Sequence, residues 1–465
     1  MPLILGTNSI KDTGYNVANS LRFNDDDSAY LSRSQVSGDA TKFTYSGWFK
    51  RSLLSDAQDF LDIYDDNNNR FGFFWSSDDQ IDMYNKTGGS TTFQKITTAK
   101  FRDVSAWYHV VISADSSLST AEDRVKLYVN GVRITSFGTN TNISQDASFS
   151  IHTSDDTLRV GSYGTGGSHY DGYMAEVVWI DGTAYAQTDF GEFDSDSPTI
   201  WKPKSETDIS ALNFGNNGFY LNFQDSSALG NDVSGQNHDL SVTNLAATDQ
   251  STDTCTNNFC TLNSISEHND STFSNGNLTY TGNASAVHMA LGSIGVTKGK
   301  WYFEAQRITG NSAYPFVGVF NTDGTMGSYL GQTVDGWSLL MDAGNNGEWR
   351  NNNTLSGTSA GTFANGDTAM VAIDMDNGKI WFGRNGTFAD SGNPSAGSGE
   401  QYSNLTGTII PAVAVYTGAS ISLNFGSPPF AISSGNTDAN SYGNFEYAVP
   451  SGYYSLNTKN LAEFG

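Results

Sequence analysis

The stretch that decides the fold is Arg124-Val125-Lys126-Leu127-Tyr128-Val129-Asn130-Gly131-Val132-Arg133-Ile134. Aliphatic residues alternate with polar or amphipathic ones over 124–129, which predicts a strand with one buried face and one wet face. Asn130-Gly131 supplies two residues that accept positive φ, as a type I′ hairpin turn requires. The strand is expected to resume with Val132 and Ile134 facing inward. The segment therefore predicts an antiparallel hairpin.

The same pattern recurs along the chain. Residues 106–112 form another apolar run before this hairpin. Residues 299–305 predict a strand in a second region. There, 370–376 and 379–382 flank Asn377-Gly378, which predicts a second hairpin with an Asn-Gly turn. A last strand over 421–426 is expected to end at Pro428-Pro429, because proline cannot donate to a sheet ladder.

Composition agrees with a chain made of strands. The 465 residues include 49 Gly and 13% aromatics, and few stretches have helical apolar spacing. We expect an all-β fold of two antiparallel β-sandwich domains of the jelly-roll type, joined by a loop-rich linker. The expected parts are an N-terminal segment 1–17, a first domain 18–224, a polar linker 225–289, a second domain 290–427 and a C-terminal extension 428–465. The extension suggests a lead-in to further chain, so the sequence is compatible with a fragment of a longer fibre.

Charge and apolar runs narrow the classes of function. The net charge of −25 opposes binding to nucleic acid and to anionic lipid. No run of about 18 apolar residues is present, so membrane insertion is not expected, and no secretory signal is visible at the N-terminus. Cys255 and Cys260 are the two cysteines, and the sequence leaves open whether they pair.

Two family resemblances follow from the motifs. Ser46-Gly47-Trp48-Phe49-Lys50, 107–111, 127–131 and 172–177 resemble laminin-G-like, concanavalin A-like lectin domains over roughly 18–200. The motifs 299–304, 317–319, 336–339, 380–386, 405–411 and 424–426 resemble a SPRY domain. The join (190–194, 201–204, 218–223 and 257–263) is similar to the linker of tailed-phage fibre proteins from aquatic environments. That resemblance implies a virion location, assembly in the host cytoplasm and a role in adsorption.

Because concanavalin A-like folds include glucan hydrolases, the resemblance raises the question whether the sequence holds a set of catalytic residues. A retaining glycosidase needs two carboxylates about 5 Å apart, held by alternate residues of one strand. The nearest match, Glu192-Phe193-Asp194-Ser195-Asp196, lacks the final Glu and falls in the predicted linker. Gly357-Thr358-Ser359-Ala360-Gly361 fits a nucleophile elbow but lacks the expected strand–helix context. His109 is expected to pack within a strand, and we expect no enzyme activity.

Metal binding is left open. Asp65-Asp66-Asn67-Asn68-Asn69-Arg70 spaces oxygen ligands like an EF-hand loop, but Arg70 stands where that loop needs Gly. A hairpin turn is the expected alternative. Laminin-G-like domains often hold calcium at their rim, so the resemblance alone keeps calcium as a candidate cofactor; no metal ligands can be named.

Candidate ligand contacts are aromatic and polar residues near expected loops, where binding residues often lie. Tyr163 and Tyr170 have an equally favoured alternative, packing at the rim of the sandwich. The full set of candidates is Trp75, Tyr84, Tyr163, His169, Tyr170, Trp349, Arg350 and Asn351.

These features favour a non-enzymatic phage tail fibre or tail-associated protein. Its expected partners are host-surface glycan or protein, other virion tail proteins and further copies of itself, with a trimer suggested by analogy. One alternative is a structural or decorating virion protein. A third function, which the sequence disfavours, is that of a tailspike polysaccharide depolymerase.

Overall fold

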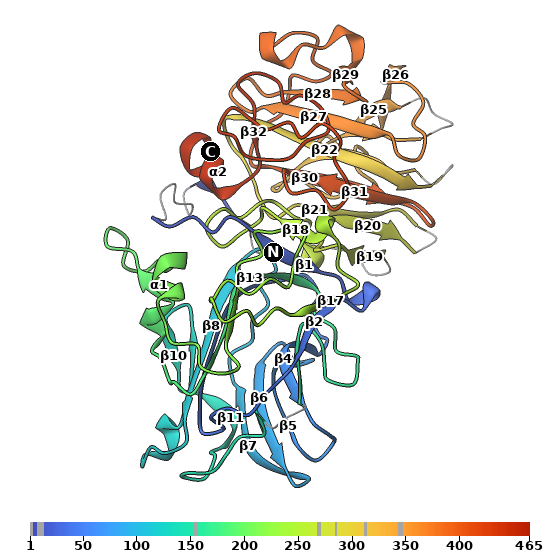
Figure 1. The fold of residues 1–465 in the computed structure, drawn as a ribbon. Helices are drawn as coiled ribbons and strands as arrows, with labels where there is room; N and C mark the ends of the chain where they lie inside the picture. The colour runs from blue at the N-terminus through green and yellow to red at the C-terminus, as the bar shows by residue number, and fades with distance from the viewer. Residues whose placement is uncertain are drawn as a thin grey trace. The chain divides into compact units, whose positions relative to one another are not determined.

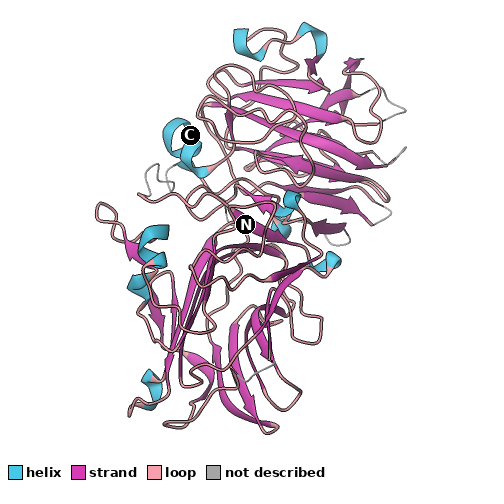
Figure 2. Ribbon diagram, in the orientation of Figure 1, coloured by secondary structure: helices cyan, strands magenta, loops and turns pink. Residues whose placement is uncertain are grey.

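The computed structural model describes residues 3–6, 14–152, 156–266, 271–283, 286–310, 314–342 and 347–465. The chain divides into two compact units (Figure 1). The first unit is Thr13–Thr256, and the second combines Met1–Asp12 with Asn257–Gly465. Strands dominate both units (Figure 2), and the described residues hold two α-helices, α1 (Glu206–Ser210) and α2 (Thr458–Phe464). The predicted all-β class is confirmed.

The first unit is built from two large antiparallel sheets. The sheet that we call the covered sheet runs in the order β10 (Val132–Ile134), β9 (Val125–Val129), β8 (Trp107–Asp115), β3 (Lys42–Arg51), β13 (Gly172–Asp181), β1 (Ser20–Phe23) and β18 (Gln250–Ser251), with β16 (Phe219–Leu221) paired to β13. The sheet that we call the open sheet runs in the order β11 (Phe137–Thr141), β7 (Ser90–Thr97), β6 (Ile81–Thr87), β5 (Arg70–Trp75), β4 (Gln58–Tyr64), β12 (Thr157–Val160), β2 (Tyr30–Ser34) and β17 (Ser241–Thr243).

Aromatic side chains fill the space between these two sheets. Phe43 on β3 meets Phe71 on β5 edge to face, with ring centroids 5.0 Å apart. Phe49 on β3 stacks on Phe60 on β4 at 4.6 Å. All four rings are fully buried. Because strand side chains alternate, the residues between these inward rings point to the outer face of each sheet.

The outer face of the covered sheet is hidden beneath the chain that follows β13. The hairpin β14 (Gly191–Phe193) and β15 (Trp201–Pro203), helix α1 and the segment leading to β16 lie in this stretch. Val111, Val178 and Ile180 of the sheet pack there against Phe190 and other residues of the stretch. The middle of the open sheet carries buried and half-buried polar side chains on its outer face instead, and the candidate site lies there.

The second unit is also a two-sheet sandwich with its own core. Its eight-stranded sheet runs in the order β19 (Ser271–Ser274), β20 (Thr279–Gly282), β31 (Ser420–Asn424), β22 (Lys300–Thr309), β27 (Thr368–Asp374), β28 (Lys379–Arg384) and β29 (Thr387–Phe388), with β32 (Tyr454–Ser455) parallel to β22. Its six-stranded sheet runs in the order β21 (His288–Leu291), β30 (Ile409–Val415), β23 (Phe316–Asn321), β24 (Gly336–Leu340), β25 (Glu348–Asn351) and β26 (Thr354–Ser359).

The expected linker and C-terminal extension are parts of the two folded units in the structure. Residues 225–289 do not form a separate bridge: β17 and β18 join the sheets of the first unit, while β19, β20 and part of β21 belong to the second. The extension 428–465 packs on the second unit, where Phe445 and Tyr453 are fully buried. Cys255 and Cys260 are not joined by a disulfide. The linker was expected to be loop-rich because its apolar positions are too sparse to show periodicity, and the extension was expected to lead into further chain.

Both Asn-Gly hairpins form, but two details differ from the expectation. Asn130 and Gly131 have φ of 47° and 77°, as a type I′ turn requires. Val132, expected to face inward, is 59% exposed because β10 is a short edge strand. At the second hairpin only Gly378 has positive φ. The Asp374 carboxylate accepts hydrogen bonds from the backbone and side chain of Asn377 and closes a wider turn.

Candidate functional site

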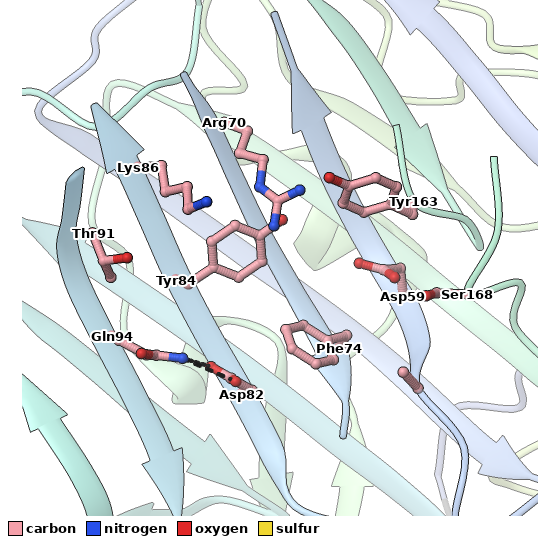
Figure 3. A pocket seen from close by; sticks show the side chains of 11 residues that line it. Asp59, Arg70, Phe74, Asp82, Tyr84, Lys86, Thr91, Gln94, Tyr163 and Ser168 are labelled. Atoms are coloured by element: carbon pink, nitrogen blue, oxygen red, sulfur yellow. Dashed lines mark hydrogen bonds between the residues drawn. The ribbon is translucent and has the colours of Figure 1, made fainter. Parts of the chain in front are cut away.

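A pocket of about 260 Å³ lies on the outer face of the open sheet. Four consecutive strands, β4 to β7, form its floor, and the loop between β12 and β13 contributes one wall (Figure 3). Aromatic, acidic, basic and amide side chains meet there. The lining residues are Ala57, Asp59, Arg70, Phe74, Asp82, Tyr84, Lys86, Thr91, Gln94, Tyr163 and Ser168.

Strand register places the lining residues in rows across the sheet. Asp59 pairs with Phe74 and Phe74 with Asp82, which forms one row. A second row runs from Asp62 through Gly72 to Tyr84 and Gln94. In the third row, Arg70 lies opposite Lys86.

Gly72 keeps the second row open. A Cβ at this position would lie 2.8 Å from Asp62 Oδ2 and 3.0 Å from Tyr84 Cε1. The absence of a side chain lets the Tyr84 hydroxyl donate to Asp62 Oδ2 at 2.7 Å across β5. Tyr84 is thereby fixed with its ring against the sheet, between the two charged ends of the pocket (Figure 3).

Asp62 also anchors the loop that walls the pocket. Its Oδ1 accepts a hydrogen bond from the Gly164 backbone N–H at 3.0 Å. The Arg159 guanidinium donates to the Tyr163 carbonyl at 3.1 Å, and the Asp59 N–H donates to the Ser168 carbonyl at 3.0 Å. A rigid sheet and three hydrogen bonds therefore hold the Tyr163 ring at the edge of the pocket.

Arg70 lies between two aromatic rings. Its guanidinium carbon is 4.9 Å from the centroid of Tyr84 and 4.7 Å from that of Tyr163, which is cation–π geometry. Within the described residues its side chain makes no hydrogen bond or ion pair, and its buried Nε has no acceptor. The ring contacts occupy the faces of the guanidinium and leave its terminal Nη groups available to a ligand.

Two carboxyl groups of the lining have altered acidity. Burial raises the pKa of Asp82 to about 6, against the opposing effect of hydrogen bonds from Gln94 Nε2. Burial, and then the neighbouring Asp62 carboxylate, raise the pKa of Asp59 well above its usual range. A raised carboxyl pKa in a pocket is characteristic of functional sites.

The structure brings only part of the predicted set together in the first unit. Tyr84 and Tyr163 line the pocket, while His169 lies in the same loop, where its Nε2 accepts from the Gly167 N–H at 3.2 Å and its ring stacks on Tyr30. The prediction that Trp75 and Tyr170 contact a ligand is wrong. Both side chains are fully buried, so no ligand can reach their rings. Both face the sandwich core.

Sequence reasoning missed most of the pocket lining. Asp59, Phe74, Asp82 and Gln94 were not singled out, and Arg70 was considered only as part of the EF-hand-like stretch. The available signal was charge at mid-strand positions: Asp82 and Lys86 flank Tyr84 at a period of two within 81–87. Charged residues on two of the three outward positions of a strand, with an aromatic residue between them, indicate a face used for more than contact with water.

In the second unit, a separate cavity of about 540 Å³ touches two of the three candidates. Trp349 and Asn351 line it together with residues of β26 and the 400–402 segment. Trp349 is 4% exposed and belongs mainly to the core. Arg350 stacks on Tyr329 and Phe316, at 5.1 and 5.9 Å, and does not line this cavity. The three residues therefore do not form one surface.

Glu192 and Asp194, the nearest match to a glycosidase carboxylate pair, are held in ion pairs. Lys204 and Lys202 both approach Glu192, and Lys202 lies 3.2 Å from Asp194. These lysines lower the pKa of Glu192. His109 is buried: Trp201 Nε1 donates to its Nδ1 at 2.8 Å, Ser46 hydrogen-bonds its Nε2, and burial lowers its pKa to about 3. Its expected packing role is confirmed.

The metal candidates lead to no defined site. Asp66 Oδ1 accepts backbone N–H groups of Asn68 and Asn69, so the EF-hand-like stretch is a hydrogen-bonded hairpin turn. In the described ranges, no three His, Cys, Asp or Glu side chains gather as metal ligands would. The same ranges contain no helix with the length and apolar character of a membrane span.

Comparison with protein families agrees with the two-unit architecture. Residues 23–189 match the concanavalin A-like lectin/glucanases superfamily, and residues 300–428 match the SPRY domain. The chain therefore carries a laminin-G-like, concanavalin A-like domain followed by a SPRY domain. The pocket described above lies within the first of these matches, and both resemblances inferred from the sequence are confirmed.

Solved structures similar to parts of the chain include three single domains or subunits. The SPRY domain of human HERC1 is 20% identical, with 35% of this chain and 96% of that chain covered and a TM-score of 0.29. A heptameric SAP-like pentraxin from Limulus polyphemus is 15% identical, with 37% and 80% covered and a TM-score of 0.28. The TRIM65 PSpry domain is 11% identical, with 36% and 91% covered and a TM-score of 0.28.

Proposed function

We propose that this protein is a non-enzymatic adhesin whose first unit binds a host-surface glycan in the pocket of the open sheet. The supporting observation is the lining itself: rings of Phe74, Tyr84 and Tyr163 beside carboxyl, amide, hydroxyl and cationic groups. Aromatic faces pack on the C–H surfaces of a sugar ring, while the polar groups select its hydroxyls. Apolar walls with a few placed polar groups are the usual character of small-ligand sites.

The volume supports one or a few sugar residues as the occupant. A cavity of about 260 Å³ is slightly smaller than the usual small-ligand pocket. A single site of this size gives modest affinity, and firm attachment then requires several copies acting together. An assembly of identical chains, such as a trimer, would supply that multivalency.

The biological setting that we propose is the tail of a bacteriophage particle. Support comes from the order of the two domains and from the joining motifs, which resemble those of tailed-phage fibre proteins. In this setting the partners are the host surface and other tail proteins, and the protein is found in the virion after assembly in the host cytoplasm.

A glycan array probed with the full chain tests the proposal. Phe74→Ala removes a half-exposed ring of the lining, and we expect it to weaken binding at least tenfold. Phe193→Ala removes a ring that is 43% exposed and lies outside the pocket, so it serves as the matched control. Equal binding by the two variants, or no binding to any array glycan, would overturn the proposal.

A role in virion assembly is the second candidate for the second unit. Strand β26 forms an edge of its sheet and exposes five of its six residues. An exposed edge offers unpaired backbone groups to a strand of another protein. Labelling of the second unit in intact particles distinguishes the candidates, because an assembly role requires this edge to be inaccessible to antibody.

A further inference from the structure

The outer-face pocket has a charge distribution that specifies its ligand more narrowly. Arg70 on β5 and Lys86 on β6 are directly opposite cross-strand neighbours, and both line the pocket. Like charges at directly opposed positions destabilise a sheet. Neither side chain has a carboxylate within ion-pair distance among the described residues, although the whole chain carries 49 Asp and Glu. Asp59 and Asp62 attract Arg70 only at longer range. Two adjacent cations without a direct ion pair favour an anionic ligand.

The Arg70 guanidinium is also oriented before any ligand arrives. Tyr84 and Tyr163 clamp its two faces, and its Nε is buried without an acceptor. A planar guanidinium fork matches the two oxygens of a carboxylate, and a preset orientation reduces the entropy lost on binding. A ligand carboxylate at this position would accept hydrogen bonds from the two terminal Nη groups that the protein leaves unused.

Of the two acidic lining residues, Asp82 lies at the other end of the pocket, whereas Asp59 lies beside Tyr163 (Figure 3). Asp82 and Lys86 are four residues apart on β6, which separates them by about 13 Å along the strand. Asp82 and its hydrogen-bonded neighbour Gln94 lie on the side away from Arg70 and Lys86 (Figure 3). These groups suit sugar hydroxyls or an amide, whereas the cationic end suits a negative group.

We propose that the pocket takes an acidic saccharide, with a uronic-acid carboxylate held by Arg70 and Lys86 and the sugar ring extending past Tyr84 toward Asp82 and Gln94. This assignment rests on the proposed glycan-binding function and adds its ligand class. Phe74 lies beside the path of the ring, in the row between Asp59 and Asp82. The carboxylate makes the charged contact, and the hydroxyl groups fix the direction of the chain.

The test is a titration of the full chain with paired oligosaccharides. The probes are trisaccharides of galacturonic, glucuronic and mannuronic acid, each with a counterpart in which every carboxyl is reduced to CH2OH. We expect at least one acid to bind ten times more tightly than its reduced counterpart. Arg70→Gln and Lys86→Gln should each remove most of that difference, and Arg70→Lys should restore only part of it because an ammonium cannot form the planar fork.

Arg133→Gln is the charge-matched control, since Arg133 lies on β10 and pairs with Asp123 outside the pocket. If Arg70→Gln does not fold, the paired sugars and Lys86→Gln still decide the outcome. Neutral probes that bind as well as acidic ones, with binding lost in Phe74→Ala, would overturn the acidic ligand but leave the adhesin proposal standing. If no acid binds more tightly than its reduced counterpart, the acidic-ligand proposal is also overturned. Loss of all glycan binding on the array would remove the parent proposal as well.

Discussion

At the scale of single residues, the buried carboxylate of Asp82 places a polar group in the pocket and lowers the stability of the folded protein. Its pKa of about 6 in the folded state exceeds the ordinary value of 3.8, because burial penalises the charged form. A carboxyl with a raised folded pKa costs nothing below about pH 4, and its cost grows as the pH rises to 6 and then stays constant. Such sites commonly exchange stability for function.

Asp82→Asn should therefore stabilise the protein at pH 7.5 by about 1 to 3 kcal/mol, since each pKa unit corresponds to roughly 1.4 kcal/mol. The asparagine carbonyl can still accept from Gln94. Unfolding in denaturant at pH 7.5 and pH 4 measures the effect, which should vanish at the lower pH. Asp65→Asn, in the exposed β4–β5 turn, is the control. A variant less stable than wild type at pH 7.5 would contradict this account.

The same titration should influence binding of an acidic sugar. Asp82 is surrounded by Gln94 on β7, Phe74 on β5, Asp59 on β4 and the more distant cations Arg70 and Lys86. Its protonation below about pH 6 removes a negative charge from the pocket, whereas a uronate remains ionised. We expect affinity for the uronic-acid trisaccharide to rise several-fold from pH 7.5 to 5.5 in calorimetric titrations. A constant affinity in wild type, or the same rise in Asp82→Asn, would speak against this coupling.

At the scale of elements, the loop between β12 and β13 completes the pocket only because it can lie close to β4. A Cβ on Gly164 would fall 2.2 Å from the Cβ of Tyr64, so any side chain pushes the loop outward. Tyr163 precedes this glycine and would leave the pocket edge with it. The hydrogen bond from the Gly164 N–H to Asp62 would be lost in the same movement.

Gly164→Ala should consequently abolish glycan binding and lower the free energy of unfolding by about 1 to 3 kcal/mol, as overpacking usually does. Gly138→Ala on β11 is the matched control, because a Cβ there has its nearest contact at 4.0 Å and φ is not in the left-handed region. Titration and thermal unfolding of the two variants provide the comparison. Unchanged binding by Gly164→Ala would show that the loop does not form the wall.

Local elements were predictable from sequence, and their assembly into a site was not. Alternation and Asn-Gly turns identified the hairpins at 124–134 and 370–382, because those signals are local. The pocket combines residues from four strands and one loop, and Asp59 and Tyr163 are adjacent in space only through the pairing of β12 with β4. No local pattern encodes that pairing. Trp75 was misplaced because a tryptophan near a turn looks the same in sequence whether it faces the core or the solvent.

At the scale of the whole molecule, each unit has its own hydrophobic core. The core clusters of the first unit contain residues of Thr13–Thr256, and the largest of them spans both of its sheets. The strands β17 and β18 are part of these sheets, so the unit extends past the boundary at 224 that the sequence predicted. Each unit meets the structural requirement for folding alone.

A fragment covering 13–256 should therefore fold and keep the pocket. We expect its affinity for glycan to stay within about threefold of the full chain, since all lining residues are included. Ending the fragment at 224 would remove β17 and β18 and should lower its stability sharply. Circular dichroism and titration of both fragments check this. A 13–256 fragment that folds without binding would place the ligand elsewhere.

The structure of the full chain in complex with the glycan that binds it most tightly tests the central claim most directly. The account predicts a sugar ring on the outer face of the open sheet, touching Phe74 and bonded to the terminal Nη groups of Arg70. A glycan bound along Trp349 in the second unit, or at the rim of the first unit away from β4 to β7, would contradict it.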